Sequence, residues 1–190
     1  MSTIPISSTQ ISVEDYLDGE IRSTIKHDYL GGVVYAMAGG SEPHNIIASN
    51  LGGILYSQLR GKRCQSFGSD MKFRINDLNS DTYFYYPDAM VACDPTDTGH
   101  GWRERPTVVF EIISEETRLV DEREKRMAYK HISALQSYVR IEQSRAEIVI
   151  DRRTATGWIT ETLTGLDAIL RLPEVEIEIP LAELYERIVF

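Results

Sequence analysis

TVVFEII, at residues 107–113, is almost entirely apolar, with a single acidic side chain at Glu111. A short run of β-branched and aromatic residues predicts a strand that is buried on both faces, inside a sheet. Glu111 breaks this pattern, because burying an unpaired carboxylate costs several kcal/mol. We therefore expect Glu111 to be paired, protonated or bound to a metal ion, although a purely structural buried carboxylate is the simpler alternative.

A second acid interrupts the strand-like stretch YYPDAMV at residues 85–91. Pro87 has no N–H to give to a sheet, so Asp88 should lie at a strand edge or a bend. Two carboxylates on neighbouring strands could converge on one hard cation, since Mg²⁺ is held by one or two carboxylates together with water and substrate phosphate. The competing interpretation is that Asp88 accepts backbone hydrogen bonds at the bend.

The segments on either side predict a mixture of helices and strands. Residues 27–40, HDYLGGVVYAMAGG, read as an N-terminal hairpin around Gly31 and Gly32, with Asp28 as a turn residue. Helices are expected at 11–17 with Ser12 as cap, from Ser41 and Pro43 to Gly61, at 115–131 with Ser114 as cap, and at 181–188. Further strands are expected at 63–67, 71–75, 83–93, 137–142, 147–151, 158–163 and 173–179, with a loop at 94–105.

This order predicts an α+β fold with an α/β/α-like core in one domain over residues 1–190. The composition, 42% hydrophobic and 26% charged, is that of a soluble globular protein. No apolar run approaches the roughly 20 residues of a membrane span, and the N-terminus lacks the pattern of a secretory signal, so we expect a cytoplasmic protein.

Two further properties of the whole chain limit the possible functions. Cys64 and Cys93 form neither a CxxC pair nor a disulfide framework, so we expect incidental or buried thiols and no zinc site. The net charge of −9 argues against a protein that coats nucleic acid by bulk electrostatics. It remains compatible with an enzyme that holds DNA locally.

YYPDAMV, followed 23 positions later by VVFEIISEET and then by DEREKRMAY, resembles the Uma-two family. The resemblance runs from YLGGVVYAMAGGSEPH to QSYVRIE and covers most of the chain. These proteins are proposed endonucleases of the PD-(D/E)xK superfamily, with a restriction-endonuclease-like mixed central sheet flanked by helices. The resemblance implies Asp88 and Glu111 as metal ligands, Mg²⁺ or Mn²⁺ as cofactor, DNA as substrate and a possible homodimer.

The motif departs from the family pattern at Ile113, where a PD…ExK motif has lysine. Glu111 and Ile113 share one face of their strand, so an apolar side chain fills the place of the lysine. The chain is similar to families in which the lysine has moved to the following helix, and Lys125 is the matching candidate. The alternative is an ordinary i,i+4 helix pair of Lys125 with Asp121.

His44 and Glu42 are additional candidates at the start of the second helix. His44 matches a histidine of the family pattern and could contact phosphate or metal, or lie on the surface; Glu42 could supply a further acid. No pattern of a sequence-specific DNA reader is present. The leading hypothesis is a metal-dependent endonuclease, against two rivals: a catalytically inactive binding or regulatory module, and a hydrolase of another phosphate ester.

Overall fold

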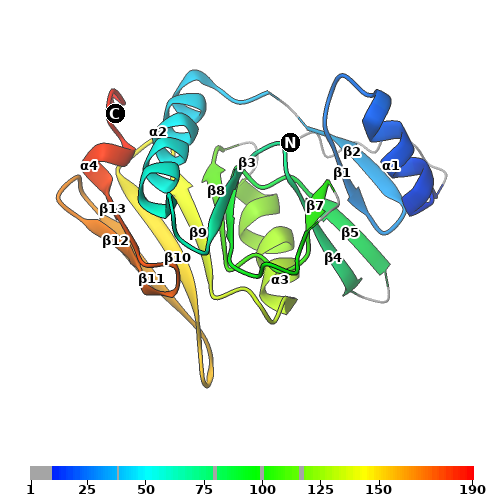
Figure 1. Cartoon of the computed structure of the whole chain (residues 1–190). Helices are drawn as coiled ribbons and strands as arrows, with labels where there is room; N and C mark the ends of the chain where they lie inside the picture. The colour runs from blue at the N-terminus through cyan, green and yellow to red at the C-terminus, as the bar shows by residue number, and fades with distance from the viewer. Residues whose placement is uncertain (1–9, 38, 79–80, 99–100, 116–117) are drawn as a thin grey trace.

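Two mixed β-sheets, one two-stranded sheet and the helices on their faces make up the described structure (Figure 1). The computed structural model describes residues 10–37, 39–78, 81–98, 101–115 and 118–190. The α+β class and the mixed central sheet flanked by helices are as predicted from the sequence. Within these described ranges, no helix is long and apolar enough to cross a membrane.

The larger sheet, sheet B, contains the apolar strand with Glu111. Its order is β11 (Gly157–Thr164), β10 (Glu147–Thr154), β9 (Ser137–Glu142), β8 (Val108–Ile113), β6 (Ala89–Ala92) and β3 (Gln65–Gly68). Strands β8 and β9 are parallel and the other pairs are antiparallel. All six residues of β8 are buried, as the apolar run predicted.

Sheet A is built around the N-terminal hairpin, in the order β2 (Val33–Ala36), β1 (His27–Leu30), β5 (Asp81–Tyr85), β4 (Lys72–Leu78) and β7 (Trp102–Arg103). Gly31 and Gly32 both have positive φ, at 55° and 97°, which is why two glycines stand at this turn. The short strand β7 lies within the segment expected to be a loop. The chain passes from sheet A to sheet B at Pro87, between β5 and β6.

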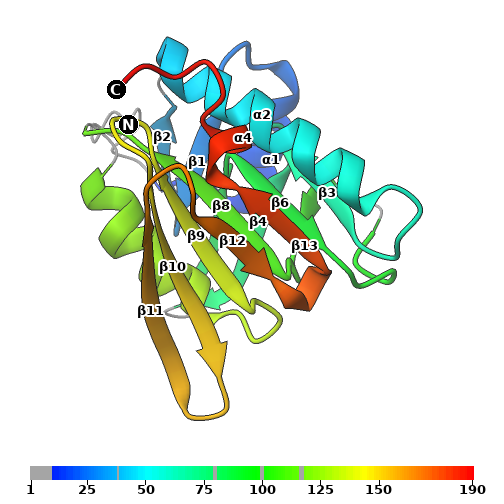
Figure 2. The same cartoon turned by 90° about the vertical axis from the view of Figure 1, so that its left-hand side faces the viewer.

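The helices separate these layers and cover their outer faces (Figures 1 and 2). α1 (Val13–Arg22) places Tyr16 against Tyr29 and Phe84 of sheet A. α3 (Arg126–His131) buries Tyr129 between the two sheets. α2 (Glu42–Leu59) packs on the other face of sheet B, in one apolar cluster with the hairpin of β12 (Ile169–Leu172) and β13 (Ile177–Pro180) and with α4 (Leu181–Leu184).

Both cap predictions at the N-terminal helices are confirmed. The Ser12 hydroxyl accepts the Asp15 N–H at the start of α1, and the Ser41 hydroxyl accepts the His44 N–H at the start of α2. Gly61, with φ of 78°, follows the end of α2.

The helix expected at 11–17 is the longer α1, and the strand expected at 83–93 is divided by the Pro87 bend into β5 and β6. Three more predicted elements differ from the structure. The charged helix contains a π-helix, η1 (Val120–Lys125), directly before α3, and the part of this prediction at residues 116–117 lies outside the described residues. The strand expected at 173–179 is a 3₁₀ turn, Pro173–Val175, followed by β13, because Pro173 begins the turn. The closing helix α4 spans only four residues.

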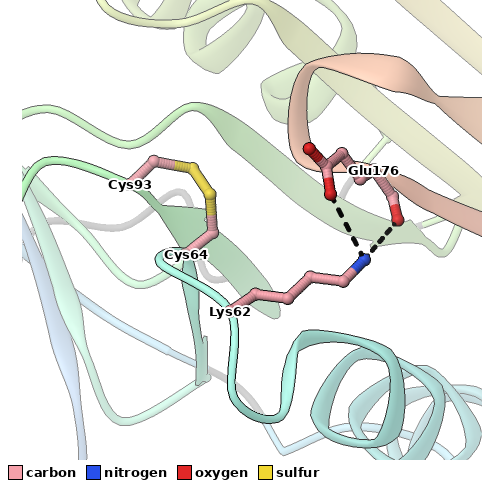
Figure 3. The surroundings of a disulfide bond; sticks show 4 residues. All are labelled: Lys62, Cys64, Cys93 and Glu176. Carbon is pink, nitrogen blue, oxygen red and sulfur yellow. Dashed lines mark hydrogen bonds and ion pairs between the residues drawn. A yellow bond between two sulfur atoms is a disulfide. The ribbon is translucent and has the colours of Figure 1, made fainter.

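The expectation for the cysteines was wrong, because Cys64 and Cys93 form a disulfide (Figure 3). Gln65 of β3 pairs with Ala92 of β6 in an antiparallel register. Cys64, just before β3, therefore lies opposite Cys93, just after β6. Sequence spacing did not indicate this pairing, since it depends on the register between two strands. Nearby, Lys62 Nζ donates to the Glu176 carbonyl at 2.8 Å.

Candidate active site

A cavity of about 590 Å³ opens where both sheets and two helices meet. It is bordered by the bend after β5, the C-terminal end of β8, the turn after β9, the N-terminal end of α2 and the π-helix η1. Its lining includes five of the six candidates, His44, Asp88, Glu111, Asp121 and Lys125. Glu42 is exposed and is not part of the lining.

Asp88 lies at the bend that Pro87 produces between β5 and β6. Its Oδ2 accepts the Ile112 N–H of the adjacent strand β8 at 2.7 Å, so the backbone hydrogen bond of the competing interpretation is present. Its Oδ1 lies 3.1 Å from Nε2 of His44. Burial would lower the pKa of His44, but the hydrogen bond and charge of Asp88 outweigh it and raise that pKa. The bend and the start of α2 thus form one polar corner of the cavity.

Glu111 forms a second polar corner with residues of η1 and α3. Its Oε1 accepts hydrogen bonds from Lys125 Nζ at 2.9 Å and from the Tyr129 hydroxyl at 2.8 Å. Lys125 Nζ also lies 3.0 Å from Asp121 Oδ1. Each of Glu111, Asp121 and Lys125 is 3% exposed or less. The ammonium of Lys125 therefore lies beside Glu111 and is also paired with Asp121, so both sequence-based interpretations of Lys125 describe real contacts.

Negative charge exceeds positive charge around this cavity. Burial raises the pKa of Glu111 well above its ordinary value, the charges of Asp121 and Asp88 raise it further, and Lys125 opposes the shift. Burial would lower the pKa of Lys125, but Asp121 and Glu111 keep it well above its ordinary value. Three carboxyl groups thus share one ammonium and the His44 ring, and an additional cation would be attracted to the cavity.

The donor set fits a hard divalent cation that is only partly held by protein. Carboxylate oxygens such as those of Asp88 and Glu111 are the ligands that Mg²⁺ and Mn²⁺ prefer. Within the part of the chain that the structure describes, no three His, Cys, Asp or Glu side chains form a complete metal-binding cluster. An ion held here would therefore take its remaining oxygens from water and substrate.

Two residues beside this site were missed or misplaced by sequence reasoning. Tyr129 follows Asp121 and Lys125 at four-residue steps on one helix face, and this spacing could have indicated it. Asp28, expected in a turn, lies in β1 and is 1% exposed. Asp28 Oδ1 accepts the Tyr86 N–H at 3.1 Å, immediately before Pro87. A polar residue three positions before Gly31 gave no indication of this burial.

The fold and the site together define a class. The mixed central sheet flanked by helices is the restriction-endonuclease-like fold expected from the sequence, and a buried acid, a Pro-Asp bend and a lysine meet in its cavity. A solved structure described as "a putative nuclease belonging to DUF820", from Anabaena variabilis ATCC 29413, superposes with a TM-score of 0.75 at 14% identity. The comparison covers 94% of this chain and 99% of that one. At this identity the likeness shows a shared fold.

Residues 13–182 match the family model "Uma2: Putative restriction endonuclease", and the chain belongs to this family. Two curated relatives come from Synechocystis sp. (strain ATCC 27184 / PCC 6803 / Kazusa), and both are described as uncharacterized. The protein slr1290 is 31% identical over 95% of this chain and 94% of its own length. The protein sll1609 is 30% identical over 73% of this chain and 78% of its own length.

Proposed function

We propose that the protein is a Mg²⁺- or Mn²⁺-dependent endonuclease that hydrolyses DNA phosphodiester bonds in this cavity. The observation that carries the proposal is the buried contact of Lys125 with Glu111, in the same cavity as Asp88 and with an excess of negative charge. The family description supports the choice of nucleic acid as substrate.

In this proposal Asp88, at the bend before β6, and Glu111, in the adjacent strand β8, would hold the ion. A bound divalent ion would lower the pKa of a water molecule and neutralise charge on the phosphate. Asp88 is kept in place by the Ile112 N–H and by His44, whose raised pKa favours a cationic ring that also attracts phosphate. Tyr129 keeps Glu111 Oε1 oriented through its hydroxyl.

Lys125 is proposed as the group that contacts the reacting phosphate or its attacking water. A lysine ammonium has three N–H donors, and one of them is given to Glu111 Oε1. Asp121 Oδ1 lies 3.0 Å from the same nitrogen as an ion pair without a hydrogen bond, so donors are left for substrate. Because Asp121 and Glu111 keep its pKa high, Lys125 acts here as a permanent cation and not as a general base.

Cleavage of supercoiled plasmid tests the proposal. Wild-type protein should nick the plasmid with Mg²⁺ or Mn²⁺ and stop when a chelator is added. Glu111→Gln should reduce the rate by at least about a hundredfold, since it removes a ligand charge while keeping the size of the side chain. Glu161→Gln is the matched control, because Glu161 lies on β11 beside Arg152, outside the cavity lining. This variant should nick the plasmid at the wild-type rate. A folded wild-type protein without metal-dependent nicking would refute the proposal.

A catalytically inactive binding or regulatory module is the second candidate. Ile113 favours it, because an apolar, 1% exposed side chain stands where the motif has lysine. That module would bind DNA or a divalent ion without cleaving the strand. Binding of Mn²⁺ in calorimetry, combined with an intact plasmid, distinguishes it from the nuclease; cleavage of small phosphate esters alone would indicate the third hypothesis.

A further inference from the structure

Asp28 is a deeply buried carboxylate to which the proposed mechanism gives no role. It lies in β1, and its Oδ1 accepts the Tyr86 N–H at 3.1 Å. Its Oδ2 is buried as well and has no hydrogen-bond partner among the described residues. At 1% exposure, Asp28 is shielded from bulk water.

The hydrogen bond to Tyr86 does not explain why this residue is an acid. A neutral acceptor of similar size, such as asparagine, could accept the same N–H. A buried carboxylate with a free oxygen destabilises the fold, because its charge is removed from water without full compensation. The charge of Asp28 should therefore have a role that stability of the metal-free protein does not supply.

The charges around Asp28 are those of the candidate active site. Burial raises the pKa of Asp28 to about 6, Lys125 is the main opposing charge, and Asp121 and Glu20 raise it further. Glu20 is already bound by the Tyr86 hydroxyl at 2.7 Å and by Nδ1 of His27 at 2.6 Å. Lys125 is shared with Glu111 and Asp121. Asp28 thus adds one more negative charge to a cluster that already has too few cations.

We propose that Asp28 is a positioning residue of the divalent-cation site: without touching the ion, its charge strengthens cation binding by Asp88 and Glu111. Its bond to the Tyr86 N–H also ties β1 to the bend that carries Asp88, two residues further on. This inference rests on the proposed function, because it requires the ion to be held by Asp88 and Glu111.

Asp28→Asn separates the two contributions, since asparagine keeps the acceptor for Tyr86 and removes the charge. Titration calorimetry of the metal-free protein with Mn²⁺ should show binding weakened about tenfold, the size typical of residues that act on a metal through its ligands. The thermal midpoint without metal should stay the same or rise, because an unfavourable buried charge is gone. The rise of that midpoint on adding Mn²⁺ should become smaller.

Asp97→Asn is the matched control. Asp97 is also a buried acid, 9% exposed, and it accepts the N–H groups of Glu104 and Arg105 outside the cavity lining. Its variant should lower the metal-free thermal midpoint and leave Mn²⁺ affinity unchanged. A purely structural Asp28 would behave in the same way as Asp97.

Four outcomes overturn the inference. If Asp28→Asn binds Mn²⁺ as tightly as the wild-type protein, the charge of Asp28 does not strengthen cation binding, while the proposed metal site stays intact. A lowered metal-free midpoint with unchanged affinity would make Asp28 structural. If Asp28→Asn does not fold, Asp28→Ser, which can still accept the Tyr86 N–H, replaces it, and failure of both to fold also indicates a structural role. If wild-type protein binds no Mn²⁺, the proposed function falls together with this inference.

Discussion

Asp151 and Asp28 are both buried aspartates, but their surroundings have opposite effects on stability. Asp151, 0% exposed on β10, is bound by Arg126 at 2.7 Å, by Arg140 at 2.8 Å and by Lys130 at 2.9 Å. Burial would raise the pKa of Asp151, but these cations and the Thr160 hydroxyl hold it well below its ordinary value. Its charge therefore stabilises the fold.

Asp151→Asn should lower the free energy of unfolding by about 3 kcal/mol at pH 7, because it leaves several cations without their shared anion. Urea unfolding as a function of pH measures this. Since the folded pKa is lowered, the stabilisation is fully present above the unfolded pKa of about 3.8 and is lost as pH falls below it. The deficit of the variant should therefore shrink in acid.

Asp70→Asn is the control for Asp151. Asp70 pairs only with Lys26 in the described structure and its side chain is 94% exposed, so little change is expected. A deficit of Asp151→Asn that stays constant down to low pH would show that charge is not the source of its effect.

The individual site residues differ in how far the sequence revealed them. Asp88 and Glu111 stood out because each is acidic in an otherwise apolar strand, and that contrast is local. The structure brings both to one cavity with Lys125, although their chemical roles stay predictions. Asp28 was misplaced, because nothing in HDYLGG distinguishes a polar turn residue from a carboxylate that β5 and η1 later enclose.

The start of α2 links an element to the site. Ser41 Oγ accepts the His44 N–H at 3.3 Å and donates to Gln143 Oε1 at 2.8 Å, which ties the helix to the turn after β9. His44 in turn faces Asp88. The cap of this helix therefore helps to place a cavity residue.

Ser41→Ala should cost about 1 kcal/mol of stability, as for other lost helix caps, and should also slow nicking, because His44 becomes less fixed. Ser12→Ala removes the equivalent cap of α1, where Ser12 accepts the Asp15 N–H at 3.1 Å, outside the cavity lining. It should cost similar stability and leave nicking unchanged. Urea unfolding and plasmid assays on both variants measure this, and equal nicking rates would contradict a role for the α2 cap in the site.

The charged helix was predicted from the sequence, but its π-helical segment was not. Lys125 contacts both Glu111 and Asp121, and Tyr129, which sequence reasoning missed, also donates to Glu111. The π-helix was not predicted, because π and α turns differ little in local sequence preference. Pairing of Lys125 with a buried acid on β8 is a tertiary interaction that can stabilise the wider turn.

At the scale of the whole molecule, the disulfide joins segments 29 residues apart. Closing a loop of this length in the unfolded chain corresponds to about 3–4 kcal/mol of stability. Reductant should therefore lower the free energy of urea unfolding by roughly that amount. The double variant Cys64→Ala, Cys93→Ala should start at the lower stability and not respond to reductant. An equal response of both proteins would show that the disulfide is not the cause.

The sequence by itself determined the α+β class, the N-terminal hairpin, the buried strand β8 and two acids placed against the apolar pattern of their strands. These properties are local, since periodicity, glycine pairs, caps and Pro-Asp depend only on near neighbours. The tertiary structure decided the disulfide, the burial of Asp28 and the cavity in which Lys125 meets Glu111. Each of these depends on strand register or helix packing between residues far apart in the chain, and no local pattern specifies such contacts.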